Sequence, residues 1–203
     1  MRTMDDDVYR DEIAPPEASP ELADNVRELL SLIGEDPDRN GLQATPLRVA
    51  RSWAFLTAGY SMDPRRVVGD AMFEAEYDEM VVERNVEVYS LCEHHLLPFY
   101  GRVHIGYLPS EKIVGLSKLA RLAEVYARRL QVQERLTTEI ANAINDILEP
   151  KGVGVVMEAK HLCMMMRGVE KQESLVVTSC MLGRFRTDAR TRSEFLSLIN
   201  RKE

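Results

Sequence analysis

Two short segments of the sequence concentrate residues that bind metals. One runs Leu91-Cys92-Glu93-His94-His95, and the other runs Lys160-His161-Leu162-Cys163. Together they hold two of the three cysteines and three of the four histidines in the chain. Thiolate and neutral imidazole are the ligands that zinc prefers. The two segments therefore predict one zinc site.

The number of candidate ligands indicates what kind of zinc site this is. The spacing of Cys92 and His95 lets a tight turn aim both at one ion, and we expect His161 and Cys163, two apart at a strand end, to face the same side. With His94 there are five candidates, whereas a catalytic zinc uses three protein ligands and keeps a position for water. The surplus imidazoles are available for proton transfer, which favours a catalytic zinc. A closed structural zinc site is the alternative.

Other residues of the same types have simpler explanations. His104 lies in a strand pattern and is expected to be structural, and Cys180 follows Val176 and Val177 and is expected to be a small buried hydrophobe. The run from Met164 to Met166 could bind a soft metal, but methionines in an apolar context usually fill a core, and we expect packing.

A second group of residues is typical of an anion site. Gly115-Leu116-Ser117-Lys118 opens a predicted helix, and free amides, helix dipole and lysine together attract phosphate there. Arg121, one turn further, and Arg167, just after the second metal segment, add forked donors that suit phosphate oxygens. Each is by itself a common surface charge. As a group near the metal segments, they predict phosphate binding.

Composition limits the class of protein. A chain of 203 residues, 45% of them hydrophobic, can bury one substantial core. A net charge of −7 argues against a general nucleic-acid or membrane surface, so a phosphate site must be local. Three cysteines without a signal-peptide pattern indicate a reducing compartment, the cytoplasm. No apolar stretch approaches the ~18 residues that a membrane span requires.

The pattern of apolar residues places these segments in a predicted architecture. Residues 1–20 are acidic and rich in proline and predict a flexible arm. Residues 21–75 form a helical segment, with one helix over 21–33 and a second that Thr45 caps and that runs to Ala58. Residues 76–203 form the catalytic domain.

Within that domain, strands and helices alternate in blocks. Strands are predicted around 86–88, 103–107, 153–159 and 175–182. Between the second and third strands, a helix that Ser117 caps is followed by another over 136–147. After the last strand, a capping box of Thr191 and Glu194 starts a helix that runs through Ile199. This order predicts an α+β fold in which an antiparallel sheet carries a helical pair on one face. Exposed sheet edges favour pairing between copies, and so an oligomer.

The motifs, taken together, resemble those of a known family. Cys92-Glu93-His94-His95, Gly115-Leu116-Ser117-Lys118, the run from Gln131 to Thr137 and the run from His161 to Gly168 stand in the order and spacing of the GTP cyclohydrolase I signatures. The resemblance covers about Leu42 to Ile199. It implies the tunnelling fold (T-fold), assembled as a toroidal homodecamer whose active sites lie where subunits meet.

The resemblance also implies a role for each site residue. Cys92, His95 and Cys163 correspond to the zinc ligands, and His94 and His161 to the catalytic acid and base. Glu134 corresponds to the residue that holds guanine, with Gln133 beside it. The positions that match the family's ribose and triphosphate contacts are Ser117, Lys118, Arg121, Arg167 and, from a neighbouring subunit, Arg48.

The activity implied is zinc-dependent hydrolysis of GTP at C8 of guanine, with release of formate and formation of 7,8-dihydroneopterin triphosphate. This is the first step toward pterins and tetrahydrofolate, and so toward one-carbon metabolism. Two alternatives stay open: a related enzyme that acts on another purine or pterin or stops at a ring-opened product, and a zinc protein without catalysis. The sequence does not distinguish folate, biopterin and deazaguanine as the end of the pathway.

Overall fold

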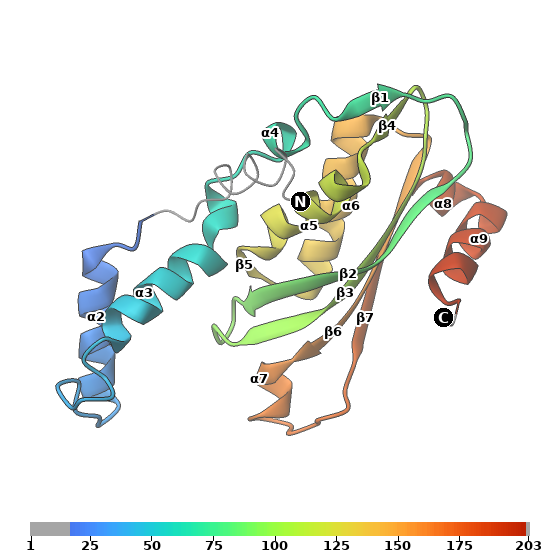
Figure 1. Cartoon of the computed structure of the whole chain (residues 1–203). Coiled ribbons are helices and arrows are strands. Elements are labelled where there is room, and N and C mark those ends of the chain that lie inside the picture. The colour runs from blue at the N-terminus through green and yellow to red at the C-terminus, as the bar shows by residue number, and fades with distance from the viewer. Residues whose placement is uncertain (1–16, 202–203) are drawn as a thin grey trace. The chain divides into compact units, whose positions relative to one another are not determined.

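The structure, a computed structural model, describes residues 17–201, and these form two compact units, residues 17–61 and 62–201 (Figure 1). Most of the predicted acidic arm, residues 1–20, lies outside the described residues. Its last residue, Pro20, begins a helix instead of ending the arm. Proline suits this place because the first turn of a helix leaves its N–H groups unpaired in any case.

The first unit contains two helices and a short 3-10 turn. Helix α2 (Pro20–Leu32) starts at Ser19, whose hydroxyl accepts a hydrogen bond from the N–H of Leu22. Helix α3 (Thr45–Leu56) is followed by η1 (Ala58–Tyr60). Both predicted helices are confirmed, but the prediction that Thr45 caps the second is wrong. The N–H of Thr45 bonds to the carbonyl of Leu42 at 2.8 Å, so Thr45 is already helical.

The second unit is built on a five-stranded sheet in the order β5-β2-β3-β6-β7. Its long strands are β2 (Val81–Cys92), β3 (Pro98–Leu108), β6 (Gly152–His161) and β7 (Val176–Gly183), and each is antiparallel to the long strand beside it. The two-residue β5 (Leu130–Gln131) runs parallel to the end of β2. The predicted α+β fold with an antiparallel sheet is confirmed.

Strand β2 is much longer than residues 86–88, the part that the alternation of apolar residues predicts. A bulge between Glu83 and Val86, with Asn85 at a φ of 59°, interrupts the alternation of apolar and polar residues along β2. Before the bulge, Val81 packs toward one cluster and Val82 toward another. A bulge changes which residues face each side of the sheet, so the alternation of apolar and polar residues identifies only the part of β2 that follows the bulge.

Two helices cover one face of the sheet, as predicted (Figure 1). They are α5 (Leu116–Ala127) and α6 (Gln133–Leu148), and their apolar stripes form one buried cluster with inward residues of β2, β3 and β6. The short helix α4 (Pro64–Val68) and the small ribbon of β1 (Met72–Glu74) and β4 (Lys112–Val114) lie at the end of the sheet where β2 begins. This packing sets the direction of α5, and so where its first residues lie relative to the candidate metal ligands.

The start of α5 differs from the prediction. Gly115 is the residue before the helix, and no side chain caps it. Ser117 is the second helical residue and so does not act as the cap.

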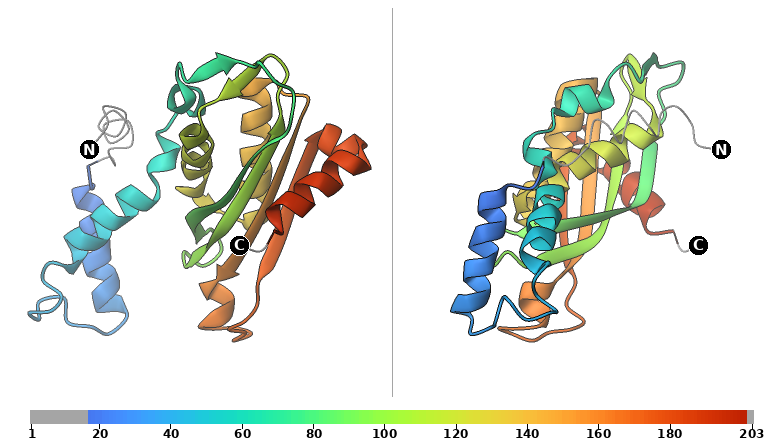
Figure 2. Two further views of the ribbon diagram at one scale, coloured as in Figure 1. Left: turned by 45° about the vertical axis from the view of Figure 1, so that its right-hand side comes forward. Right: turned by 60° about the vertical axis from the view of Figure 1, so that its left-hand side comes forward.

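Two further helices cover part of the opposite face (Figure 2). They are α8 (Arg184–Thr187) and α9 (Ala189–Ile199), and their Phe185 and Phe195 pack edge to face with ring centroids 5.3 Å apart. Gly106 and Gly154, paired across β3 and β6, make room for these rings. A Cβ atom on Gly154 would lie 2.4 Å from a ring carbon of Phe185, so any side chain there would displace the helices.

The predicted capping box of the last helix is wrong. Asp188 caps α9, since its carboxylate accepts from the N–H of Arg190 at 2.8 Å and from the hydroxyl of Thr191 at 3.2 Å. An aspartate just before a helix competes well for this place. Thr191 therefore lies inside the helix.

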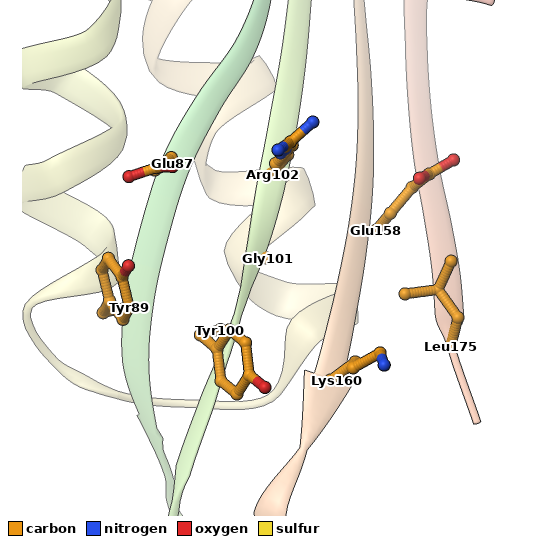
Figure 3. A pocket seen from close by; sticks show the side chains of 8 residues that line it. All are labelled: Glu87, Tyr89, Tyr100, Gly101, Arg102, Glu158, Lys160 and Leu175. Carbon is orange, nitrogen blue, oxygen red and sulfur yellow. The ribbon is translucent and has the colours of Figure 1, made fainter. Parts of the chain in front are cut away.

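The rest of this second face holds an open groove of about 380 Å³ (Figure 3). Its polar centre is the cross-strand row of Glu87, Arg102 and Glu158, and beside it the rings of Tyr89 and Tyr100 stack with centroids 6.2 Å apart. The residues that line the groove include no cysteine or histidine. The candidate metal ligands lie elsewhere.

Candidate metal centre and adjoining pocket

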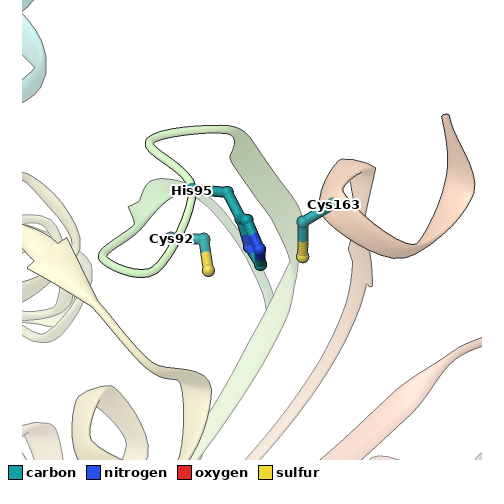
Figure 4. A group of neighbouring side chains, drawn as sticks. All are labelled: Cys92, His95 and Cys163. Carbon is teal, nitrogen blue, oxygen red and sulfur yellow. The ribbon is translucent and has the colours of Figure 1, made fainter. Parts of the chain in front are cut away.

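Three side chains from separate elements meet at one end of the sheet (Figure 4). Cys92 ends β2, His95 lies in the turn between β2 and β3, and Cys163 lies in the short helix α7 (Leu162–Met165). Their ligand atoms all lie within 4.8 Å of one another. A tetrahedral ion with bonds of about 2.0–2.3 Å holds its ligands roughly 3.3–3.8 Å apart, so small side-chain rotations complete the set.

The turn that presents His95 is fixed by the backbone. The N–H of Cys92 bonds to the carbonyl of Leu97 at 2.9 Å, and the N–H of Leu96 bonds back to the carbonyl of Cys92 at 2.8 Å. Leu96 takes a φ of 56°, a left-handed conformation that a tight reversal requires. The turn therefore returns His95 toward Cys92, as the spacing of the two residues predicts.

The expectation that His161 and Cys163 face the same side of a strand is wrong. His161 is the last residue of β6, and the chain turns into α7 immediately after it. Successive helical residues are rotated by about 100°, so the alternation of a strand does not extend to Cys163. As a result the thiol points to the other two ligands, while the imidazole of His161 enters a neighbouring pocket.

The surroundings of Cys163 favour its protonated thiol when no metal is bound. Burial, first of all, and then the adjacent Cys92 raise the pKa of the Cys163 thiol, because both disfavour a thiolate. A bound divalent cation reverses this preference and deprotonates coordinating thiols. Cys92, Cys163 and Cys180 are all free thiols. Two thiols and an imidazole at this separation therefore fit a metal that accepts sulfur and nitrogen ligands.

A pocket of about 210 Å³ adjoins these ligands. It is lined by Cys92, His94, Gln131, Val132, Gln133, Glu134, His161, Met164 and Val176. Five of these are predicted site residues, and Gln133 and Glu134 enter as the first two residues of α6. The fold thus joins the two metal segments to the run that begins at Gln131.

The methionines near the pocket are not core residues, so the prediction of packing is wrong for them. Met164 lines the pocket, and 64% of Met166 is exposed. The reason is that α7 is a single turn with no buried residue. His104, in contrast, is buried in β3, where its Nδ1 accepts from the N–H of Asn85 at 3.3 Å, and is structural as predicted. Cys180 is partly buried against the core, close to its predicted role.

The two histidines outside the ligand set differ in environment. His94 is exposed, with Nδ1 4.0 Å from the sulfur of Cys92. His161 is partly buried, stacks on Phe99 and holds Nε2 2.8 Å from Oε1 of Gln133. Burial lowers the pKa of His161, and the nearby carboxylate of Glu134 partly offsets this effect. His161 therefore favours the neutral imidazole.

Of the predicted phosphate ligands, one reaches the metal set directly. NH1 of Arg167 donates a hydrogen bond to Nε2 of His95 at 2.9 Å. Arg48 is exposed on α3, in the first unit.

Ser117 and Lys118 lie in the first turn of α5, and Arg121 lies near its middle. This helix follows β4 at the end of the sheet where β2 begins, and it leads to β5, which pairs with Leu91 and Cys92. A helix of 12 residues is about 18 Å long. Ser117 and Lys118 are therefore separated from the metal ligands of the same chain by about one helix length, and neither lines the pocket.

Sequence reasoning missed three residues that support the site. Phe99 covers one face of His161, Thr178 accepts from the side-chain amide of Gln133, and Thr137 bonds to Thr178 and to the backbone carbonyl of Gln133. A phenylalanine in a strand and threonines in a strand and a helix carry no signal of their own, because their importance depends on which segments the fold brings together.

Comparison with known proteins identifies relatives along almost the whole chain. A family model described as GTP cyclohydrolase I matches residues 22–200. "GTP cyclohydrolase 1" of Deinococcus radiodurans is 58% identical over 174 residues, covering 86% of this chain and 81% of that protein. The protein of the same name from Leptospira biflexa is 60% identical over 174 residues, with 86% and 95% covered, and that from Chlorobium phaeovibrioides is 57% identical over 185 residues, with 91% and 83% covered.

A more distant structural match and the hydropathy of the helices complete the comparison. The crystal structure of the archaeosine synthase QueF-Like in the apo form aligns with a TM-score of 0.45 and 14% identity, covering 53% of this chain and 97% of that chain. Among residues 17–201, no helix is long and apolar enough to cross a membrane.

Proposed function

Since the chain belongs to the GTP cyclohydrolase I family, we propose that it opens the guanine imidazole ring of GTP at C8, releases formate and forms 7,8-dihydroneopterin triphosphate. It is a hydrolase of pterin and folate biosynthesis. The observation that carries the assignment is the meeting of Cys92, His95 and Cys163 beside a pocket that contains two further histidines. A closed structural site would have no use for that pocket.

Zinc is the metal that we propose for Cys92, His95 and Cys163. Two thiolates and one imidazole form a set of three protein ligands, which leaves the fourth tetrahedral position open. When bound, zinc supplies the Lewis acidity that makes water a nucleophile near neutral pH. The ligands belong to β2, its turn and α7, so the sheet determines where that chemistry takes place.

His94 and His161 are the proposed acid and base. Both line the pocket, and imidazole exchanges protons near neutral pH. In this reaction one of them protonates N7 of guanine while the ring opens, and the two move protons in the later steps. The exposed His94 and the partly buried His161 differ in environment, which is how two groups of one type take different roles.

Glu134 is the proposed guanine ligand. Its carboxylate is exposed at the start of α6 and lines the pocket, where it can accept from both N1–H and the exocyclic amine. Adenine offers no such pair of donors. A volume of about 210 Å³ is below the usual range for a whole drug-sized ligand, so the base lies inside and the triphosphate outside.

The triphosphate is assigned to Ser117, Lys118, Arg121, Arg167 and Arg48. Because Ser117 and Lys118 are about one helix length from the metal ligands of their own chain, a second copy must supply them. We therefore propose a homo-oligomer, a decamer as in the family, with active sites between subunits. The catalytic part is a T-fold domain over 76–203, preceded by the helical segment 21–75, and the free thiols suit the cytoplasm.

The decisive test is incubation of the zinc-loaded protein with GTP, followed by detection of formate and, after oxidation, of fluorescent neopterin. ATP in place of GTP and a chelator serve as controls. Both products from GTP alone, lost on chelation, are expected. Formate without pterin would indicate a relative that stops at the ring-opened product. Neither product would indicate a zinc protein without catalysis.

A further inference from the structure

The side-chain amide of Gln133 is surrounded by groups that determine its orientation. Its Nε2 lies 3.1 Å from the carbonyl oxygen of Met157, 3.0 Å from that of Val176 and 3.1 Å from Oγ1 of Thr178. Carbonyl oxygens only accept hydrogen bonds, so the NH₂ end of the amide must face them. The reversed amide would place three oxygens together. Gln133 is 1% exposed, so water does not relieve that repulsion.

The orientation of this amide determines the state of His161. Oε1 of Gln133 lies 2.8 Å from Nε2 of His161, and an amide oxygen can only accept. Nε2 must therefore carry the hydrogen, and in the neutral imidazole Nδ1 carries the lone pair. The hydrogen bond at one ring nitrogen thus selects the tautomer that reacts at the other.

Two threonines complete a closed ring of hydrogen bonds around Gln133. The hydroxyl of Thr137 donates to the backbone carbonyl of Gln133 at 2.8 Å, and the hydroxyls of Thr137 and Thr178 lie 2.7 Å apart. Since Thr137 already donates, Thr178 donates to Thr137 and keeps a lone pair for the Gln133 amide. Each hydroxyl has one consistent role, which stabilises a single arrangement of the ring.

We propose that Gln133 and Thr178 are positioning residues that hold His161 in the Nε2–H tautomer, with Nδ1 as the atom that exchanges protons. Gln133 then does not contact the purine, in contrast to the role that the family resemblance implies for it. The stacked ring of Phe99 prevents His161 from tilting away from the amide. This inference rests on the proposed function, in which His161 moves protons during ring opening.

Thr178→Val is the mildest test, because valine keeps the shape and removes only the hydroxyl. One neutral hydrogen bond corresponds to a change of about three- to tenfold, and we expect kcat for formate release to fall by that factor. KM, the dissociation constant of GTP and the zinc content should not change, and Thr178→Ser should restore kcat. Thr138→Val is the matched control, since the exposed Thr138 makes the same type of bond to the carbonyl of Glu134 outside the ring.

Gln133→Leu separates positioning from substrate contact. A positioning role predicts a loss in kcat on the order of 100-fold with unchanged GTP binding by calorimetry. A contact with guanine predicts weaker GTP binding instead and would overturn the proposal. Should Gln133→Leu fail to fold, Thr178→Val decides alone, because it leaves the two carbonyl contacts of the amide intact.

The outcomes also separate this inference from the function on which it rests. Wild-type protein that releases no formate from GTP overturns the proposed function, and this inference with it. Active wild-type protein with an equally active Thr178→Val variant overturns the inference alone. In a His161→Ala background, Thr178→Val should cause no further loss, since both act through one imidazole.

Discussion

Phe99 and His161 are cross-strand partners whose rings lie parallel, with centroids 4.7 Å apart and planes 7° from each other. The register of β3 and β6 produces this contact, because it pairs the second residue of one strand with the last residue of the other. A fully buried ring thus supports an imidazole that enters the pocket. The proposed catalytic histidine is held by the sheet and not by a loop.

Replacing Phe99 should therefore affect catalysis more than stability alone explains. We expect Phe99→Leu to lower the free energy of unfolding by about 1–2 kcal/mol and kcat by about tenfold, with unchanged zinc content. Phe185→Leu is the matched control, since Phe185 is equally buried but lies on the other face of the sheet. Thermal unfolding and formate release measure the two effects. Equal kcat in both variants would contradict a supporting role for Phe99.

Substitutions at Cys163 and His161 should distinguish metal binding from proton transfer. Cys163→Ala removes one of three ligands and should lose both zinc and activity, whereas His161→Ala should keep zinc and lose ring opening. Metal analysis after dialysis, with a formate assay on the same samples, tests this. Full activity of either variant would remove that residue from its assigned role.

Glu134→Gln should weaken guanine binding. The amide keeps the size of the side chain but offers one oxygen and a donor, so it cannot accept from both N1–H and the exocyclic amine. Hydrogen bonds to charged groups contribute about 1.5–3 kcal/mol, so we expect KM for GTP to rise about 10- to 100-fold. Glu149→Gln, at the opposite end of α6, is the control. An unchanged KM would place guanine recognition elsewhere.

A site shared between copies makes a further prediction. Lys118→Met and His161→Ala should each be inactive alone, because one lacks a proposed phosphate ligand and the other a proposed proton carrier. Subunits of the two variants, mixed and reassembled, should regain activity, since some sites then combine an intact Lys118 with an intact His161. Absence of recovery after proven mixing would mean that each chain builds its own site.

His104 should make stability depend on pH. Burial, first of all, lowers the pKa of His104, and Arg84 and Arg102 act in the same direction, whereas Glu158 opposes them. The unfolded chain then binds the proton more readily than the folded chain. The contribution of neutral His104 is fully present above about pH 6.5 and is lost as the pH falls through the folded-state pKa.

His104→Gln tests this directly. Glutamine keeps an acceptor for the N–H of Asn85 but does not titrate. We expect the melting temperature of the wild type to fall more than that of His104→Gln between pH 8 and pH 5, at equal protein concentration. Parallel melting temperatures in the two proteins would exclude His104 as the group that titrates.

The sequence predicts the main elements because their signals are local. The apolar stripes of α5 and α6 and the alternation in β3 and β6 identify four elements, although the alternation locates only residues 103–107 of β3, which begins at Pro98. Helix starts are less predictable, since several residues near each start can cap it. Asp188 takes the place expected of Thr191, because it lies earlier and accepts from the first free N–H groups.

The candidate site likewise contains residues with a local sequence signal and residues without one. Cysteine and histidine are rare enough that their types and spacing identify five candidate ligands, among which the family resemblance selects Cys92, His95 and Cys163, and the structure brings these three together. Phe99 and Thr178 cannot be recognised from residue type and spacing, because such residues are common in strands. Their roles depend on the register of β3, β6 and β7, which a pattern of apolar residues does not specify.

Gln133 and Glu134 are adjacent in the first turn of α6, yet one is enclosed in the core and the other is exposed in the pocket. A helix rotates neighbouring residues by about 100°, so the two side chains reach the same pocket with different exposure. An engineer who wishes to change the base that this enzyme accepts could therefore vary Glu134, the proposed guanine ligand, and keep the hydrogen-bond ring behind Gln133. Such a change also lowers the pKa of His161, because the carboxylate of Glu134 raises it, so recognition and reactivity are coupled design variables here.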